Sequence, residues 1–103
     1  MRKPYKSPKL NLIMGTASVK IKIMPESPST NLKELENHAG IIIKKHRGIN
    51  PHFTEEPIAF GLKSVIASFE WPEEEELEKL EKELGRIKDV KSAELSDIRR
   101  AIG

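Results

Sequence analysis

The 103-residue sequence predicts an α+β fold in which a four-stranded antiparallel sheet carries two helices on one face. Three observations predict it. Two segments, 16–24 and 62–71, alternate apolar and polar residues with period two, as half-buried strands do. Two others, 31–48 and 72–87, repeat apolar residues at helical spacing. A Pro and a Gly four residues apart, Pro57 and Gly61, lie between two β-prone runs and mark a hairpin.

The first strand and the first helix have clear limits. In the strand, one face consists of Ala17, Val19, Ile21 and Ile23, and the other of Ser18, Lys20 and Lys22. For the helix, Thr30 or Asn31 can act as N-cap, Glu34 completes a capping box after Asn31, and Gly48 is a plausible end. The apolar positions of this helix are Leu32, Leu35, Ala39, Ile42 or Ile43, and His46. A short strand over 41–43 is the alternative, but the caps favour a helix.

The predicted hairpin joins strands over 52–60 and 62–71. Pro57 fixes its own φ and Gly61 tolerates positive φ, so the pair suits a bent connection. Ile58 and Phe60 are large and apolar where a loop is normally polar. Either they fold back as a small core under the tip, or the tip holds an aromatic side chain out for a partner.

The second helix is expected to begin at Pro72, with the acidic residues 73–76 in its first turn. Its apolar stripe is Leu77, Leu80, Leu84 and Ile87. The acidic run is therefore interpreted as a solvated helix start. Residues 90–98 alternate as a last strand.

The order strand, helix, strand, strand, helix, strand is that of the ferredoxin-like split βαβ fold, with the first and third strands central. We assign residues 15–103 to this domain. Residues 1–14 hold four of the 18 basic residues and no acidic ones, and we interpret them as a flexible basic extension. Met14 is an alternative translation start.

Catalytic and metal-site motifs are missing from the sequence. The absence of cysteine removes disulfides, thiolate ligands and thiol nucleophiles, and it suits a reducing, cytoplasmic location. The histidines His38, His46 and His52 have no metal-ligand spacing, and adjacent Glu55 and Glu56 in a strand point to opposite faces. Apolar runs are too short to span a membrane. The residues therefore predict a binding module with no cofactor, no metal and no catalytic residue.

Three segments, 19–28, 55–63 and 90–100, closely resemble the archaeal elongation factor 1 beta family, and the similarity runs from about Met14 to Gly103. The resemblance implies a ferredoxin-like guanine nucleotide exchange factor. Its partner would be the GTPase elongation factor 1 alpha with bound GDP or GTP and Mg²⁺, and it would bind neither nucleic acid stably nor a membrane.

In eukaryotic relatives the aromatic at the hairpin tip inserts into the GTPase, and a lysine near the C-terminus approaches the magnesium and phosphate region. Phe60 and Gly61 match that tip, and Lys63 matches a basic residue beside it. The C-terminal lysine has no match, and Arg99 and Arg100 stand near that end. Lys63 or an arginine could supply a cation that opposes Mg²⁺. The partner-binding residues expected on this basis are Pro57, Ile58, Phe60, Gly61, Lys63, Arg99 and Arg100.

Two alternatives use the same fold. One is an RNA-binding or ribosome-associated module without exchange activity, which would use the basic extension and the face formed by Ser18, Lys20 and Lys22. The other is an acylphosphatase-like enzyme, which is disfavoured because the turn over 25–28 holds no arginine for a phosphate cradle.

Overall fold

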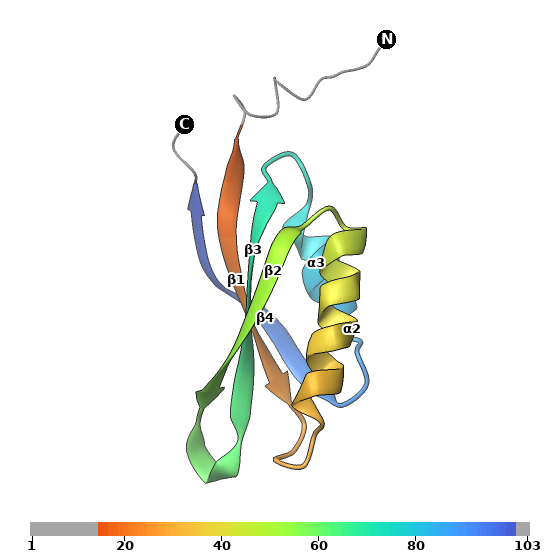
Figure 1. Ribbon diagram of the computed structural model, residues 1–103, viewed down its shortest axis with the longest axis vertical. Coiled ribbons are helices and arrows are strands. Elements are labelled where there is room, and N and C mark those ends of the chain that lie inside the picture. The colour runs from red at the N-terminus through yellow and green to blue at the C-terminus, as the bar shows by residue number, and fades with distance from the viewer. Residues whose placement is uncertain (1–14, 101–103) are drawn as a thin grey trace.

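The computed structural model describes residues 15–100, and its elements alternate as the sequence predicts (Figure 1). In chain order they are β1 (Thr16–Pro25), α2 (Leu32–Lys45), β2 (Ile49–Pro57), β3 (Lys63–Pro72), α3 (Leu77–Leu84) and β4 (Val90–Arg100). A single short turn, η1 (Ala59–Gly61), lies between β2 and β3. The ferredoxin-like order of elements is confirmed.

The four strands form one antiparallel sheet in the order β2-β3-β1-β4, so β1 and β3 are central as predicted. Both helices lie on the same face of the sheet, and the other face is open (Figure 1). Residues at the start of β1 lie beside the ends of β3 and β4, because Ser18 pairs with both Glu70 and Arg99. The β2–β3 hairpin therefore projects from the opposite end of the sheet.

The core lies between the sheet and the helices. Every second residue of β1 and β3 is buried there, which confirms the predicted alternation. The buried apolar side chains are Ala17, Val19, Ile21, Ile23, Leu35, Ala39, Ile43, Val65, Ala67, Phe69, Trp71, Leu80, Leu84 and Val90. Phe69 and Trp71 pack edge to face with ring centroids 5.8 Å apart, a favoured aromatic geometry.

Helix α2 begins as predicted and ends differently. The Asn31 Oδ1 atom accepts a hydrogen bond from the Glu34 backbone N–H at 3.1 Å, so Asn31 is the N-cap. At the other end Arg47 adopts the left-handed conformation (φ 78°), and the Gly48 N–H donates to the Ile43 carbonyl at 2.8 Å. The left-handed residue is thus Arg47 and not Gly48. Position 48 requires glycine because a Cβ there would overlap the Ile43 side chain. The alternative of a strand over 41–43 is wrong.

Helix α3 begins at Leu77, and the prediction that it begins at Pro72 is wrong. Pro72 is the last residue of β3, where it pairs with Thr16. The buried indole of Trp71 donates its Nε1–H to the Glu75 carbonyl at 3.0 Å, which holds residues 73–76 in a turn before the helix. The predicted apolar stripe of this helix is confirmed, because Leu80 and Leu84 are buried and Leu77 and Ile87 pack against the core.

The hairpin strands are shifted from their predicted limits. Strand β2 begins at Ile49 because Asn50 (φ 50°) and Pro51 form a bulge opposite β3. Pairing between β1 and β3 stops at Ile23–Val65, so residues 56–64 continue as a two-stranded extension, here called the arm.

The flexible basic extension and the alternative start at Met14 concern residues 1–14, which lie outside the described part of the chain. Within residues 15–100, no helix is both long and apolar enough to cross a membrane.

Candidate functional site

The free end of the arm is a tight, internally hydrogen-bonded turn. The Ile58 N–H donates to the Leu62 carbonyl at 2.8 Å, and the Leu62 N–H donates to the Ala59 carbonyl at 3.2 Å. Between them Phe60 has φ 62° and ψ 32°, and Gly61 has φ 77°. The turn is closed by backbone groups, so the side chains at the tip are not needed to hold it.

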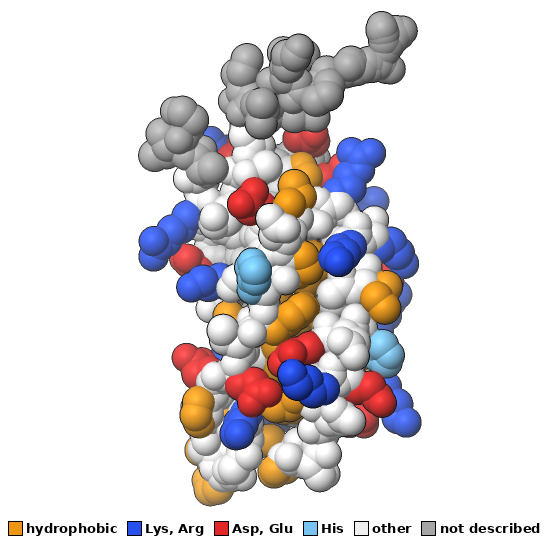
Figure 2. All heavy atoms as spheres, in the orientation of Figure 1, with side chains coloured by type: hydrophobic (Ala, Val, Ile, Leu, Met, Phe, Trp, Pro, Cys, Tyr) orange, Lys and Arg blue, Asp and Glu red, His pale blue; other side chains and the backbone are white. Residues whose placement is uncertain are grey.

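The Phe60 side chain is 93% exposed. The interpretation that Phe60 folds back under the tip is therefore wrong, while Ile58 is partly buried. Figure 2 shows hydrophobic side chains gathered at this free end of the hairpin, away from the helices. A solvated aromatic ring on a turn closed by backbone hydrogen bonds is a candidate contact residue.

Two ion pairs lie at the base of the arm, one on each face of the sheet. Lys63 Nζ is 3.9 Å from Glu55 Oε1, next to the Pro57–Lys63 pair that begins the loop. On the open face Lys22 Nζ is 3.9 Å from Glu56 Oε1. All four side chains are well solvated, so these pairs are weak and Lys63 can exchange its partner.

Arg99 and Arg100 lie at the opposite end of the sheet from the tip. Glu70, which is level with Arg99, lies seven positions along β3 from Lys63, a distance of about 23 Å at the usual rise per residue. Of the three candidate cations, Lys63 lies beside the tip and Arg99 and Arg100 do not. The sequence alone does not show this, because it depends on the register between the strands. Lys63 is brought together with Pro57, Ile58, Phe60 and Gly61.

The two arginines also face different sides of the sheet. Between the pairs Lys20–Asp97 and Ile21–Leu95, Ser96 is an extra residue, which forms a bulge in β4. As a result Arg99 points to the open face, where its Nε is 3.1 Å from Asp97 Oδ2. Arg100 points to the helix side, with its Nε 3.3 Å from Glu73 Oε2.

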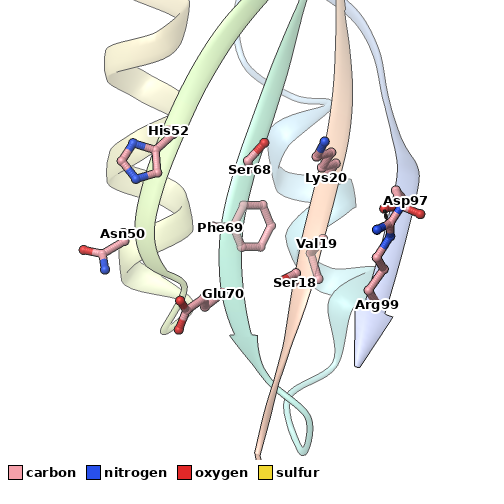
Figure 3. Close-up of a pocket in the computed structure, with 10 residues that line it drawn as sticks. All are labelled: Ser18, Val19, Lys20, Asn50, His52, Ser68, Phe69, Glu70, Asp97 and Arg99. Carbon is pink, nitrogen blue, oxygen red and sulfur yellow. Dashed lines mark hydrogen bonds and ion pairs between the residues drawn. The ribbon is translucent and has the colours of Figure 1, made fainter. Parts of the chain in front are cut away.

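The open face holds a shallow hollow of about 400 Å³. Figure 3 shows its lining residues rising from all four strands: Ser18, Val19, Lys20, Asn50, His52, Ser68, Phe69, Glu70, Asp97 and Arg99. Acidic and basic side chains are mixed in it, and Arg99 is paired with Asp97. The hollow is not a basic stripe of the kind that binds RNA backbones. No sequence pattern predicts Asn50 here, because its placement depends on the β2 bulge.

A cluster of titratable groups, Lys45, His46 and Glu83, lies between α2 and α3. No group of three or more metal-ligating side chains occurs within residues 15–100. His46 is used structurally, with its Nε2 2.7 Å from Glu83 Oε1, and Lys45 Nζ is 2.8 Å from Glu83 Oε2. Hydrogen bonds from His46 and Lys45 lower the pKa of the Glu83 carboxyl below its ordinary value. This cluster joins the end of α2 to α3.

Residues 18–101 match the model of the EF-1 guanine nucleotide exchange domain. A protein named elongation factor 1-beta from Methanosarcina barkeri is 36% identical over 88 residues, which cover 84% of this chain and 99% of the relative. Proteins of the same name from Methanococcus vannielii and Methanocaldococcus jannaschii are each 34% identical over 86 residues, covering 82% of this chain and 97% of each relative. The chain therefore belongs to the EF-1 guanine nucleotide exchange domain family, and it is an exchange factor for elongation factor 1 alpha in translation elongation.

Proposed function

We propose that this chain releases GDP from elongation factor 1 alpha by binding alone, with Phe60 as an apolar wedge and without covalent chemistry. The observation that supports it is the 93% exposure of Phe60 on a turn closed by its own backbone. GDP, GTP and Mg²⁺ bind to the GTPase, and the exchange factor acts on the GTPase loops around them.

An exchange factor of this kind binds the nucleotide-free GTPase more tightly than the nucleotide-bound form. Linkage makes the effect reciprocal, so the affinity of the GTPase for nucleotide falls by the same factor. A coupling free energy of about 4 kcal/mol weakens nucleotide binding roughly a thousandfold.

Phe60 can supply a large part of this coupling. Full burial of a solvated phenylalanine side chain is worth about 2–3 kcal/mol. The ring contributes to coupling only if its pocket opens when the phosphate-binding loops of the GTPase move, because a pocket present in both states stabilises both equally. The remainder must come from other contacts.

In this proposal Lys63 supplies the polar contact at the tip. It lies at the base of the turn, loosely held by Glu55 at 3.9 Å, and its charge can weaken Mg²⁺ binding or pair with carboxylates that support the ion. Pro57, Ile58 and Gly61 shape the turn that carries Phe60. Arg99 and Arg100 lie about 23 Å away by strand register, so in this proposal any contact by either arginine is with a separate part of the GTPase.

The test is the rate of GDP release from elongation factor 1 alpha of the same source, with wild-type protein and the Phe60→Ala variant. We expect Phe60→Ala to slow release by about 30-fold or more, the factor that corresponds to 2 kcal/mol. Ile41→Ala is the matched control, since Ile41 is a 65%-exposed apolar residue on α2, away from the tip. An unchanged rate with Phe60→Ala would exclude the wedge role.

A further inference from the structure

The turn at the tip has two consecutive residues with positive φ, Phe60 at 62° and Gly61 at 77°. A hydrogen bond from the Leu62 N–H to the Ala59 carbonyl closes it. This is the pattern of a type I′ turn, whose two central positions favour Asn, Asp and Gly. Position 61 follows that preference and position 60 does not.

Gly61 has open space around it. A Cβ built at Gly61 would meet no atom within 4 Å, so packing does not require glycine at this position. Its φ of 77° favours glycine, because L residues rarely adopt that conformation. The contrast with Gly48 is clear, since there a side chain would overlap Ile43.

We propose that Gly61 is a positioning residue, whose left-handed backbone keeps the turn in the form that presents Phe60 to the GTPase. Gly61 then acts through Phe60 and makes no essential contact of its own. The proposal rests on the wedge role of Phe60.

The proposal has a kinetic signature. An alanine at position 61 disfavours the left-handed conformation, so the presenting form of the tip becomes a minor state. Apparent affinity for the GTPase falls in proportion to that population, while complexes that do form release GDP as before. We therefore expect Gly61→Ala to raise the half-saturating concentration of exchange factor about 5- to 30-fold, with the maximal GDP-release rate retained.

The experiment measures GDP release against exchange-factor concentration for four further variants. Gly61→Asn should restore most of the affinity, because asparagine tolerates positive φ. The double variant Phe60→Ala with Gly61→Ala should be no slower than Phe60→Ala alone, since Gly61 acts through Phe60. Gly61→Ser repeats the Gly61→Ala test in case that variant fails to fold. Gly40→Ala is the control, because a Cβ there makes only ordinary contact with the Phe53 ring at 3.7 Å.

The outcomes separate this proposal from the wedge role. If Phe60→Ala slows release but Gly61→Ala and Gly61→Ser keep the wild-type half-saturating concentration, positioning by Gly61 is wrong and the wedge stands. Failure of Gly61→Asn to recover affinity also overturns it, because the absence of a side chain would then matter more than φ. An effect of Gly61→Ala that persists in full on the Phe60→Ala background shows a contact independent of Phe60.

Discussion

Phe60 combines a side chain that is 93% exposed with a backbone φ of 62°. An L residue in the left-handed region costs roughly 1–2 kcal/mol, and a solvated ring recovers none of that cost by burial. The residue therefore lowers the stability of the isolated domain. Strain of this kind without a structural gain is typical of a functional site.

Replacing Phe60 should reveal this conflict between stability and function. We expect Phe60→Asn to raise the free energy of unfolding by about 1 kcal/mol, because asparagine accepts positive φ, while GDP release slows as it does with Phe60→Ala. Phe60→Ala keeps the backbone cost and should gain much less. Urea denaturation measures the free energy of unfolding of both variants. Equal stabilisation by Asn and Ala would show that the exposed ring, and not the backbone conformation, lowers the stability of the wild-type domain.

The sequence predicts the position of the turn but not the exposure of Phe60. Pro57 and Gly61 mark the loop through their own backbone preferences, which are local. Whether an apolar side chain in a loop folds back or projects depends on the direction of the backbone at that residue. The positive φ of Phe60 is not a preference of phenylalanine, so no sequence pattern indicates it.

The start of α3 shows how a tertiary contact overrides a local preference. Pro72 and the acidic residues after it are typical of a first helical turn. The buried Trp71 indole, however, needs a hydrogen-bond acceptor, and it finds one in the Glu75 carbonyl at 3.0 Å. Helix α3 therefore begins only at Leu77.

Arg99 and Arg100 have different surroundings because consecutive strand residues point to opposite faces, and the β4 bulge sets which arginine lies on which face. Since they face opposite sides of the sheet, a partner that docks on one side contacts only one of them. We expect one of Arg99→Ala and Arg100→Ala to slow GDP release by about tenfold or more, as for a charged interface contact, and the other to change it less than about twofold.

Lys91→Ala is the control for that pair, because Lys91 is an exposed cation near the other end of β4. The double variant of Arg99 and Arg100 should match the more damaging single one. If the double variant releases GDP at the wild-type rate, this end of the sheet has no part in exchange. Equal losses in both single variants would show that the partner wraps around the strand end.

The contact between α2 and α3 predicts a pH dependence of stability. His46 and Lys45 lower the pKa of the Glu83 carboxyl in the folded state. A carboxyl with a lowered folded pKa contributes stability above its ordinary pKa and loses that contribution as the pH falls through the folded value. Glu83→Gln should therefore destabilise the domain near neutral pH and make little difference in strong acid.

Thermal unfolding of wild type and Glu83→Gln at a series of pH values measures this difference. Glu78→Gln is the control on the same helix, since Glu78 forms no ion pair with another residue in 15–100. A gap in melting temperature between wild type and Glu83→Gln that stays constant down to strong acid would contradict the assignment.

At the scale of the whole molecule, the fold follows closely from the sequence. Period-two alternation in β1 and β3 marks two half-buried central strands, and two apolar helical stripes show that one face of the sheet is covered. The positions of the candidate site residues in the sheet do not follow from the sequence. Phe60 and the arginines lie at opposite ends because of strand register, and one extra residue, Ser96, decides which of Arg99 and Arg100 lies on the open face. Both depend on pairing between strands, which a single sequence does not specify.

The arm has a consequence for how the domain opens in solution. Beyond the Ile23–Val65 pair, residues 56–64 have no third strand beside them, and a two-stranded hairpin is only marginally stable in water. Amide hydrogens at the tip therefore exchange with solvent through local opening, while those of β1 and the adjoining part of β3 require global unfolding. The arm, which we propose contacts the GTPase, is thus a separate cooperative unit, which can change its sequence or shape while the core remains folded.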